Sequence, residues 1–229
     1  MTISDHDVVS APTGTTRLIP SRFPPVPAFD AVTSVDDLAA VMDLEGWTND
    51  RLVAPRLSRL PPADWVYGRP NASVVMAAFL HGSPGGLRFS DATLGAWYGS
   101  TDLTTAILEV ANGLRKEIAV SALTQKSESY RQYTADLEGD FVDIFGKHPE
   151  YHDPDDESYP TPQAFGRRLR NQGTRAGIRY ESVRRKGYEN WVCFRPPYVR
   201  NVVQADHFKI EVPKNGSVVV RQLSGSPAF

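Results

Sequence analysis

The stretch from Leu87 to Val110, "LRFSDATLGAWYGSTDLTTAILEV", changes from strand-like to helical patterning along its length. Short runs of apolar and small residues predict strands over "GLRFS" (86–90) and "AWYGS" (96–100). The segment "STDLTTAILEVANGLRKEI" (100–118) then repeats apolar residues at helical spacing, which predicts an amphipathic helix. The chain contains no glycine-rich phosphate loop of the Walker or Rossmann type, so nothing here indicates a doubly wound nucleotide-binding fold.

Arg88, Tyr98 and Glu109 are polar residues of this stretch that lie in three different predicted elements. An arginine at a strand edge, a half-buried tyrosine and a glutamate on a helix surface are all common structural features of a soluble protein. The same three residue types could also form a catalytic site. Their spacing alone does not distinguish these two interpretations.

Three further helices are predicted on either side of this stretch. "SVDDLAAVMDLEG" (34–46) offers Ser34 as the residue that caps its N-terminus. "NASVVMAAFLHG" (71–82) is predicted to be capped by Asn71. "TPQAFGRRLRNQG" (161–173) ends at a glycine, which is typical of a helix C-terminus.

Six more strands are predicted, and most of them lie late in the chain. They are "IAVSAL" (118–123), "DFVDIF" (140–145), "AGIRYESV" (176–183), "NWVCF" (190–194), "HFKIEV" (207–212) and "SVVVRQL" (217–223). Helices do not alternate regularly with these strands. We therefore predict an α+β fold with mixed or mostly antiparallel sheets and flanking helices.

The composition is that of a soluble globular protein, with 229 residues of which 41% are hydrophobic and 23% charged. A net charge of −2 argues against a dedicated nucleic-acid binder, so no direct nucleic-acid contact is expected. The single cysteine, Cys193, excludes an internal disulfide framework and favours a reducing compartment. The longest mostly apolar run, 72–80, is about half as long as a membrane-spanning helix, so no membrane insertion is expected. The N-terminus lacks the pattern of a secretion signal, which predicts a cytoplasmic protein.

Residues 1–16 are rich in Ser, Thr, Asp and Pro without periodicity, which predicts a flexible N-terminal tail. Residues 17–229 are numerous enough to bury a full hydrophobic core. Nothing in their pattern requires a second domain. We predict one domain over 17–229, with a helical N-terminal part.

Two other groups of residues are candidate sites. His148 and His152 lie four residues apart, as two zinc ligands on a helix do. Pro149 and the polar residues around the two histidines disfavour a helix in this segment, so no metal site is expected. The segment 167–186 is rich in arginine and could grip the phosphates of a nucleic acid or a dinucleotide. A solvated helix face followed by a strand is the favoured interpretation of that segment.

The chain resembles the RES domain family, the toxins of bacterial RES–Xre toxin–antitoxin pairs. In that family a glycine pair precedes an arginine and an aromatic residue, and a tyrosine and then a glutamate follow. Here these features are Gly85 and Gly86, Arg88 with Phe89, Tyr98 and Glu109, and the family's "G-I-x-Y-x-S" pattern is met by Gly177, Ile178, Tyr180 and Ser182. The resemblance extends from about Arg17 to about Phe194, so it covers most of the chain. The chain departs from the family's pattern where Leu87 separates the glycine pair from Arg88, and where Ser90 replaces a frequent asparagine.

The resemblance implies a fold like that of ADP-ribosyltransferases of the diphtheria-toxin type, with NAD as substrate and without a resident cofactor. Some members of the family degrade NAD at the nicotinamide–ribose bond by hydrolysis or phosphorolysis, and at least one modifies a protein with ADP-ribose. The resemblance also implies a partner, an antitoxin with an Xre-like DNA-binding domain, and hence a hetero-oligomer. We therefore expect an NAD-degrading toxin. Two alternatives remain: an ADP-ribosyltransferase that modifies a cellular protein, and, more weakly supported, a nucleic-acid-binding module or RNase toxin.

The chemistry of NAD fits the residues that match the family's motif. Glu109 could stabilise the positive charge that builds on the ribose, and Tyr98 could hold the nicotinamide ring. Arg88 could bind the pyrophosphate through its planar fork, and Ser182 could add a neutral donor. Arg17 is a second, weaker candidate for the pyrophosphate.

Overall fold

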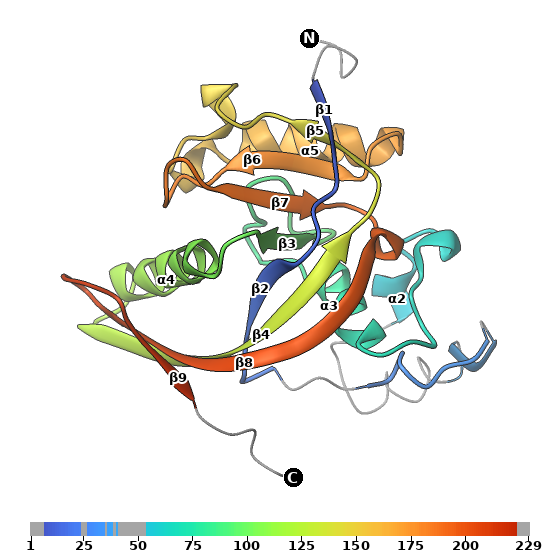
Figure 1. The fold of residues 1–229 in the computed structure, drawn as a ribbon, viewed down its shortest axis with the longest axis horizontal. Coiled ribbons are helices and arrows are strands. Elements are labelled where there is room, and N and C mark those ends of the chain that lie inside the picture. The colour runs from blue at the N-terminus through green and yellow to red at the C-terminus, as the bar shows by residue number, and fades with distance from the viewer. Residues whose placement is uncertain (1–6, 24–26, 35, 39, 41–53, 224–229) are drawn as a thin grey trace.

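The computed structural model describes residues 7–23, 27–34, 36–38, 40 and 54–223. The described strands form a nine-stranded sheet in the order β1-β5-β6-β7-β3-β2-β4-β8-β9 (Figure 1). Strands β5 and β6 are parallel, and the other neighbours are antiparallel. The α+β fold with a mixed, mostly antiparallel sheet is thus confirmed.

The bounds of the elements are as follows. The strands are β1 (Asp7–Ser10), β2 (Thr15–Pro20), β3 (Trp97–Ser100), β4 (Gln125–Leu137), β5 (Asp140–Asp143), β6 (Gly177–Glu181), β7 (Glu189–Cys193), β8 (Val199–Pro213) and β9 (Val219–Leu223). The helices are α2 (Ala54–Leu57), α3 (Ala72–Leu80), α4 (Leu103–Ala119) and α5 (Pro160–Gln172). Short 3₁₀ turns at Pro62–Asp64, Pro149–Tyr151, Asp156–Ser158 and Pro196–Tyr198 connect them.

Helix α4 lies against the curved part of the sheet that β2, β4 and β8 form (Figure 1). Its buried face carries Leu114 and Ile118, which belong to one apolar cluster with Leu18, Tyr130 and Ile210 of these strands. The spacing of four between the two helix residues places them on one face. The N-terminal half of α4 is thereby held beside β3, and this brings Glu109 close to the centre of the sheet.

Helix α5 covers the other part of the sheet, where β5, β6 and β7 lie (Figure 1). Phe165 and Leu169, one turn apart, are buried in a cluster with Ile178 and Val192. The predicted helix over 161–173 is therefore confirmed. The larger apolar cluster surrounds α3, which is buried on nearly all sides, as its continuous apolar sequence indicates.

The capping of the helices differs in part from the sequence-based expectation. Ser34 caps as predicted, because its hydroxyl accepts a hydrogen bond of 3.0 Å from the Asp37 amide, while residues 41–46 of that predicted helix lie outside the described residues. Asn71 does not cap α3, because its side-chain amide donates to the Val202 carbonyl over 2.8 Å. The carboxylate of Asp30 takes that role, because it accepts from the backbone amide of Ser73 in the first turn at 2.8 Å and from the backbone amide of Asn71 at 2.9 Å.

Two predicted strands are wrong. Residues 86–90 form a tight turn, in which the Leu87 amide donates to the Ser90 carbonyl over 2.7 Å. Gly86 has a φ of +73°, and a Cβ there would lie 2.5 Å from the Ser90 oxygen, so this turn favours glycine. The strand predicted over residues 118–123 is also wrong, because α4 continues to Ala119 and β4 begins only at Gln125.

The prediction of a flexible tail over residues 1–16 is wrong for residues 7–10 and 15–16. Residues 7–10 form β1, which pairs with β5, and Thr15 and Thr16 are buried at the start of β2. Strand β1 lies at one edge of the sheet and has no apolar period, so its pairing is visible only in the folded chain.

Candidate active site

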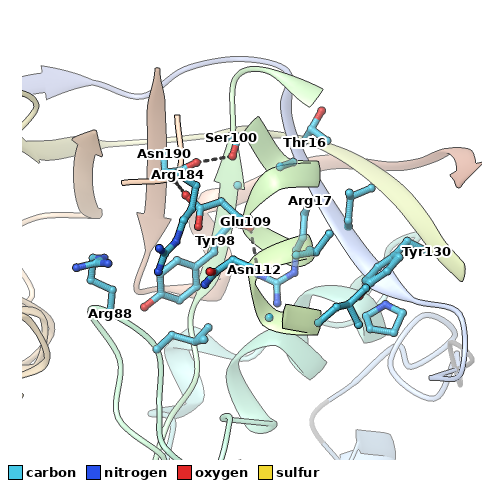
Figure 2. A pocket seen from close by; sticks show the side chains of 18 of the residues that line it. Thr16, Arg17, Arg88, Tyr98, Ser100, Glu109, Asn112, Tyr130, Arg184 and Asn190 are labelled. Atoms are coloured by element: carbon cyan, nitrogen blue, oxygen red, sulfur yellow. Dashed lines mark hydrogen bonds between the residues drawn. The ribbon is translucent and has the colours of Figure 1, made fainter. Parts of the chain in front are cut away.

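A cavity of about 360 Å³ lies beside α4, between that helix, the turn at 87–88 and strands β2 and β3. This volume is in the range of ligand-binding pockets. Figure 2 shows Glu109 reaching from α4 toward Asn190 and Arg184, with Tyr98 and Arg88 on one side and Arg17 and Tyr130 on the other. The polar and aromatic side chains that line it include Arg17, Arg22, Arg88, Tyr98, Ser100, Glu109, Asn112, Lys116, Glu117, Tyr130, Tyr159, Tyr180, Arg184 and Asn190.

The carboxylate of Glu109 is held by two neutral donors. The hydroxyl of Ser182 and the side-chain amide of Asn190 both donate to its Oε1, each over 2.7 Å. Within the described part of the chain, Oε2 has no hydrogen-bond partner. The half-buried carboxylate therefore has one fixed oxygen and one that is available to a ligand.

Tyr98 lies on β3 with its ring at the cavity and its hydroxyl bound to the turn that carries Arg88. The phenol oxygen accepts from the Phe89 amide at 3.0 Å, and it shares a second hydrogen bond of 3.0 Å with the hydroxyl of Ser90. Burial is the main reason that the pKa of Tyr98 is raised. Ser90, the departure from the family's asparagine, thus keeps a polar contact to this tyrosine.

Arg88 is only 6% exposed, and one of its guanidinium nitrogens is committed to the backbone. Its Nη1 donates to the carbonyls of Tyr151 and Asp153, at 3.0 and 2.7 Å. The guanidinium lies 5.0 Å from the ring centre of Tyr159. Arg88 therefore holds the loop at 151–153, and it also lines the cavity.

Arg17 reaches the cavity from β2, and its Nη1 donates to the Tyr98 carbonyl over 3.2 Å. Its guanidinium lies 5.0 Å from the ring centre of Trp97. The Nε atom is buried without a partner among the described residues, and burial lowers the pKa of Arg17 to about 10. A buried cation with a free donor is a group that an anionic ligand would stabilise.

Ser182 is placed differently from the other sequence-predicted residues. Arg17, Arg88, Tyr98 and Glu109 all line the cavity, whereas Ser182 is 1% exposed and lies behind Glu109. Its oxygen also accepts from the backbone amides at 184 and 185, over 3.2 and 3.1 Å. The hydroxyl is therefore engaged with Glu109 and with its own turn.

Sequence reasoning missed Asn190, Ser100 and Tyr159, and it considered Arg184 only as a member of the arginine-rich segment 167–186. Asn190 stands in the predicted strand "NWVCF", where a single amide among buried apolar residues was the available signal. Tyr159 lies in the irregular loop before α5, and no local pattern indicates its position at the cavity.

The other two candidate groups do not form sites of their own. Arginines of the 167–186 segment are dispersed over several partners: Arg179 pairs with Asp143 and Glu189, and Arg175 lies 3.6 Å from Asp140. The Nδ1 of His152 bonds to the His148 carbonyl over 3.0 Å. In the described ranges there is no cluster of three or more metal-ligating side chains, and no helix there is long and apolar enough to span a membrane.

Comparisons with known proteins identify the family of the chain. The sequence model described as RES domain matches residues 56–212, more than half of the chain. "Uncharacterized protein y4oC" of Sinorhizobium fredii (strain NBRC 101917 / NGR234) is 30% identical over 146 residues. That alignment covers 58% of this chain and 57% of the relative, so the chain spans little more than half of that protein's length. Arg88, Tyr98, Glu109 and Ser182 lie inside the matched range, and Arg17 lies outside it.

Proposed function

The chain belongs to the RES domain family, and from this premise we propose that it cleaves the bond between nicotinamide and ribose in NAD. NAD is the substrate in this proposal, and the ADP-ribosyl group passes to water or to inorganic phosphate. The observation that carries the proposal is the carboxylate of Glu109, one oxygen of which has no hydrogen-bond partner among the described residues, in a cavity lined by more cations than carboxylates.

The charges around the cavity suit a dinucleotide. Five cationic side chains and two carboxylates line it. Among the described residues, Arg17, Arg88 and Arg184 form no ion pair with a carboxylate, and the Nε of Arg184 is buried without a partner. The pyrophosphate of NAD carries two negative charges that could supply the missing counter-charge. A neutral or cationic ligand would leave these guanidinium groups unpaired.

A single carboxylate is enough for this reaction because nicotinamide leaves as a neutral ring. The bond between the ring nitrogen and C1′ of the ribose breaks with its electron pair on the nitrogen, so no general acid is needed. Positive charge then builds on the ribose, and the fixed carboxylate of Glu109 stabilises it electrostatically. A water oxygen binds C1′ and loses a proton to solvent, which gives ADP-ribose, nicotinamide and H⁺.

The remaining groups bind and orient the substrate. The ring of Tyr98 offers a flat face for the nicotinamide, and Arg88 offers its planar fork to the pyrophosphate. Arg17 lies on the other side of Glu109 from Arg88 in Figure 2, where it could hold a second phosphate oxygen. These contacts would hold the scissile bond beside Glu109, and such orientation contributes strongly to rate.

The biological role that fits this activity is that of a toxin that lowers cellular NAD. As a member of a family of toxins paired with Xre-type antitoxins, the chain would be neutralised in a hetero-oligomer with such a protein. An antitoxin that covers the cavity need only exclude a dinucleotide to inhibit the enzyme. Contacts with DNA would then come from the antitoxin.

The first test is Glu109→Gln. This change nearly preserves shape but removes the charge that faces the ribose, and we expect the rate of nicotinamide release to fall on the order of a hundredfold or more. The measurement is nicotinamide release from NAD by the purified full chain. Glu138→Gln is the matched control, because Glu138 is an exposed carboxylate paired with Arg200, and such pairs contribute little.

The products distinguish the proposal from its alternatives. Nicotinamide and free ADP-ribose, or its phosphate ester, support NAD degradation. Label from NAD that becomes attached to an added cellular protein would favour ADP-ribosyl transfer instead. If the wild-type chain consumes no NAD, or if folded Glu109→Gln turns over at the wild-type rate, the proposed mechanism is wrong.

A further inference from the structure

The two oxygens of Glu109 have different surroundings. Oε1 accepts two hydrogen bonds of 2.7 Å, while Oε2 has no hydrogen-bond partner among the described residues. The Glu109 side chain lines the cavity. A carboxylate that must act on a ribose needs one oxygen free and a fixed rotation about its terminal bond. The question is which residues fix that rotation.

Ser182 supplies one of the two donors. Its oxygen accepts from the backbone amides of Arg184 and Arg185, so its single hydrogen is directed to Glu109. The residue is 1% exposed and does not line the cavity. Its hydroxyl therefore lacks a free position for a pyrophosphate oxygen.

Asn190 supplies the other donor, and a neighbouring strand orients it. Residues Ser100 of β3 and Asn190 of β7 lie directly opposite each other in the antiparallel pairing of these strands. The Ser100 hydroxyl donates to the Asn190 side-chain oxygen, which leaves the amide nitrogen facing Glu109. Figure 2 shows this sequence of contacts from Ser100 through Asn190 to Glu109.

Burial makes this arrangement rigid. Ser100 and Asn190 are each 3% exposed, and both backbones are fixed in the central strands of the sheet. Turning the Asn190 amide over would place two acceptor oxygens against each other at Glu109 and leave the Ser100 hydroxyl facing a nitrogen. In a buried site such unsatisfied groups are destabilising, so the observed orientation of the amide is favoured.

We propose that Asn190, oriented by Ser100, is a positioning residue that holds Oε1 of Glu109 so that Oε2 faces the ribose of the substrate. This inference rests on the proposed function. Asn190 lines the cavity, and in this proposal it acts through Glu109. The amide nitrogen of Asn190 can only donate, so Oε1 of Glu109 is the acceptor in this contact.

The test uses Asn190→Asp in the full chain. The change is nearly isosteric, but it replaces a donor to Oε1 with a second carboxylate, and a neighbouring like charge disfavours the ionised form. The acidic limb of the rate profile should therefore move to higher pH, and turnover at neutral pH should fall by up to about a hundredfold, because a small misplacement of a catalytic group has a cost of this order. Asn171→Asp, the same change at an exposed position of α5, should leave the profile unchanged.

Ser100→Ala is the milder variant, for the case that Asn190→Asp does not fold. It removes the hydroxyl that orients the amide, and we expect a lower kcat with little change in KM for NAD. A substrate-binding role would raise KM instead. A purely structural role would reduce the folded fraction without moving either the acidic limb or the kcat of the folded enzyme.

A measurement independent of turnover separates this inference from the proposed function. The titration of the Glu109 carboxyl carbon, followed by NMR in wild type and in the variant that folds, reports the contact directly. The midpoint should move to higher pH in Asn190→Asp, or in Ser100→Ala to a smaller extent, and not in Asn171→Asp. An unchanged midpoint and unchanged rate profile would overturn the role of Asn190. Failure of the wild-type chain to release nicotinamide would overturn the proposed function alone.

Discussion

At the scale of single residues, Arg88 combines two tasks that depend on the shape of its guanidinium. One nitrogen donates to the carbonyls of Tyr151 and Asp153, and the planar group lies against the ring of Tyr159. The same group lines the cavity. A lysine has three donors on one nitrogen at the end of a flexible chain, so it lacks the planar fork with which a guanidinium can hold the loop on one side and bind a phosphate on another.

We therefore predict that Arg88→Lys impairs the enzyme although it retains the charge. Loss of one charge-assisted hydrogen bond, about 1.5–3 kcal/mol, should raise KM for NAD roughly ten- to a hundredfold with a smaller change in kcat. Steady-state kinetics of nicotinamide release measure both values. Arg200→Lys, in an exposed ion pair with Glu138, is the control. If the Arg88→Lys enzyme has the wild-type KM for NAD, Arg88 acts only as a point charge.

The individual residues also show which parts of the candidate site could be predicted from the sequence alone. The resemblance in the motif identified Arg88, Tyr98 and Glu109, and the structure brings these three to one cavity. It did not reveal that Ser182 lies behind Glu109, because a serine in a strand-like pattern carries no information on what its hydroxyl contacts. Asn190 escaped detection for the same reason, since its partner Ser100 is ninety positions away in the chain.

At the scale of elements, strand β6 positions the residues behind Glu109, and its close packing depends on Gly177. This glycine begins the strand and lies opposite Cys193 of β7 and beside Phe141 of β5. A Cβ there would overlap the Val192 carbonyl oxygen and come within 2.7 Å of the Phe141 ring. The contact cannot relax without separating the strands, because a backbone atom is involved.

Gly177→Ala should consequently lower the free energy of unfolding by roughly 3 kcal/mol and shift Ser182 away from Glu109. Gly113→Ala is the matched comparison, since Gly113 is an exposed residue within α4 and a Cβ there meets no atom within 4 Å. That second change should raise stability by about 0.5–1 kcal/mol. Urea unfolding measures both. Equal stability of the two variants would mean that β6 and β7 can separate locally at little cost.

Elements with a strong local period were predictable, and those with a weak one were not. Helices α4 and α5 were found from the sequence because their apolar residues recur at helical spacing within one segment. Strand β4 was missed because its sequence, "QKSESYRQYTADL", is mainly polar, and its stability comes from pairing with β2 and β8 on either side. The turn at 86–90 resembled a strand because five residues are too few to separate the two patterns.

At the scale of the whole molecule, the site is assembled by long-range strand pairing. Arg17 of β2 contacts the backbone of β3 across 81 positions in the chain, and the cavity draws on residues from Thr16 to Asn190. No local pattern encodes the strand order that places β2 between β3 and β4. The composition and the motif therefore predicted the kind of fold and part of the site, while the sheet order that joins them required the structure.

Expression of the chain alone in a bacterium is predicted to stop growth and to lower cellular NAD, because Glu109 and the cations around it face an accessible cavity. The Glu109→Gln chain should be harmless, since it lacks the charge that stabilises the cationic ribose. Coexpression with an Xre-type antitoxin should restore both growth and the NAD pool. If the antitoxin contacts the rim of the cavity, it should still bind the harmless Glu109→Gln chain. Viable counts and the NAD pool are measured in parallel, with Glu138→Gln as the toxic control. Growth arrest with an undiminished NAD pool would contradict NAD depletion and favour ADP-ribosylation of a cellular protein.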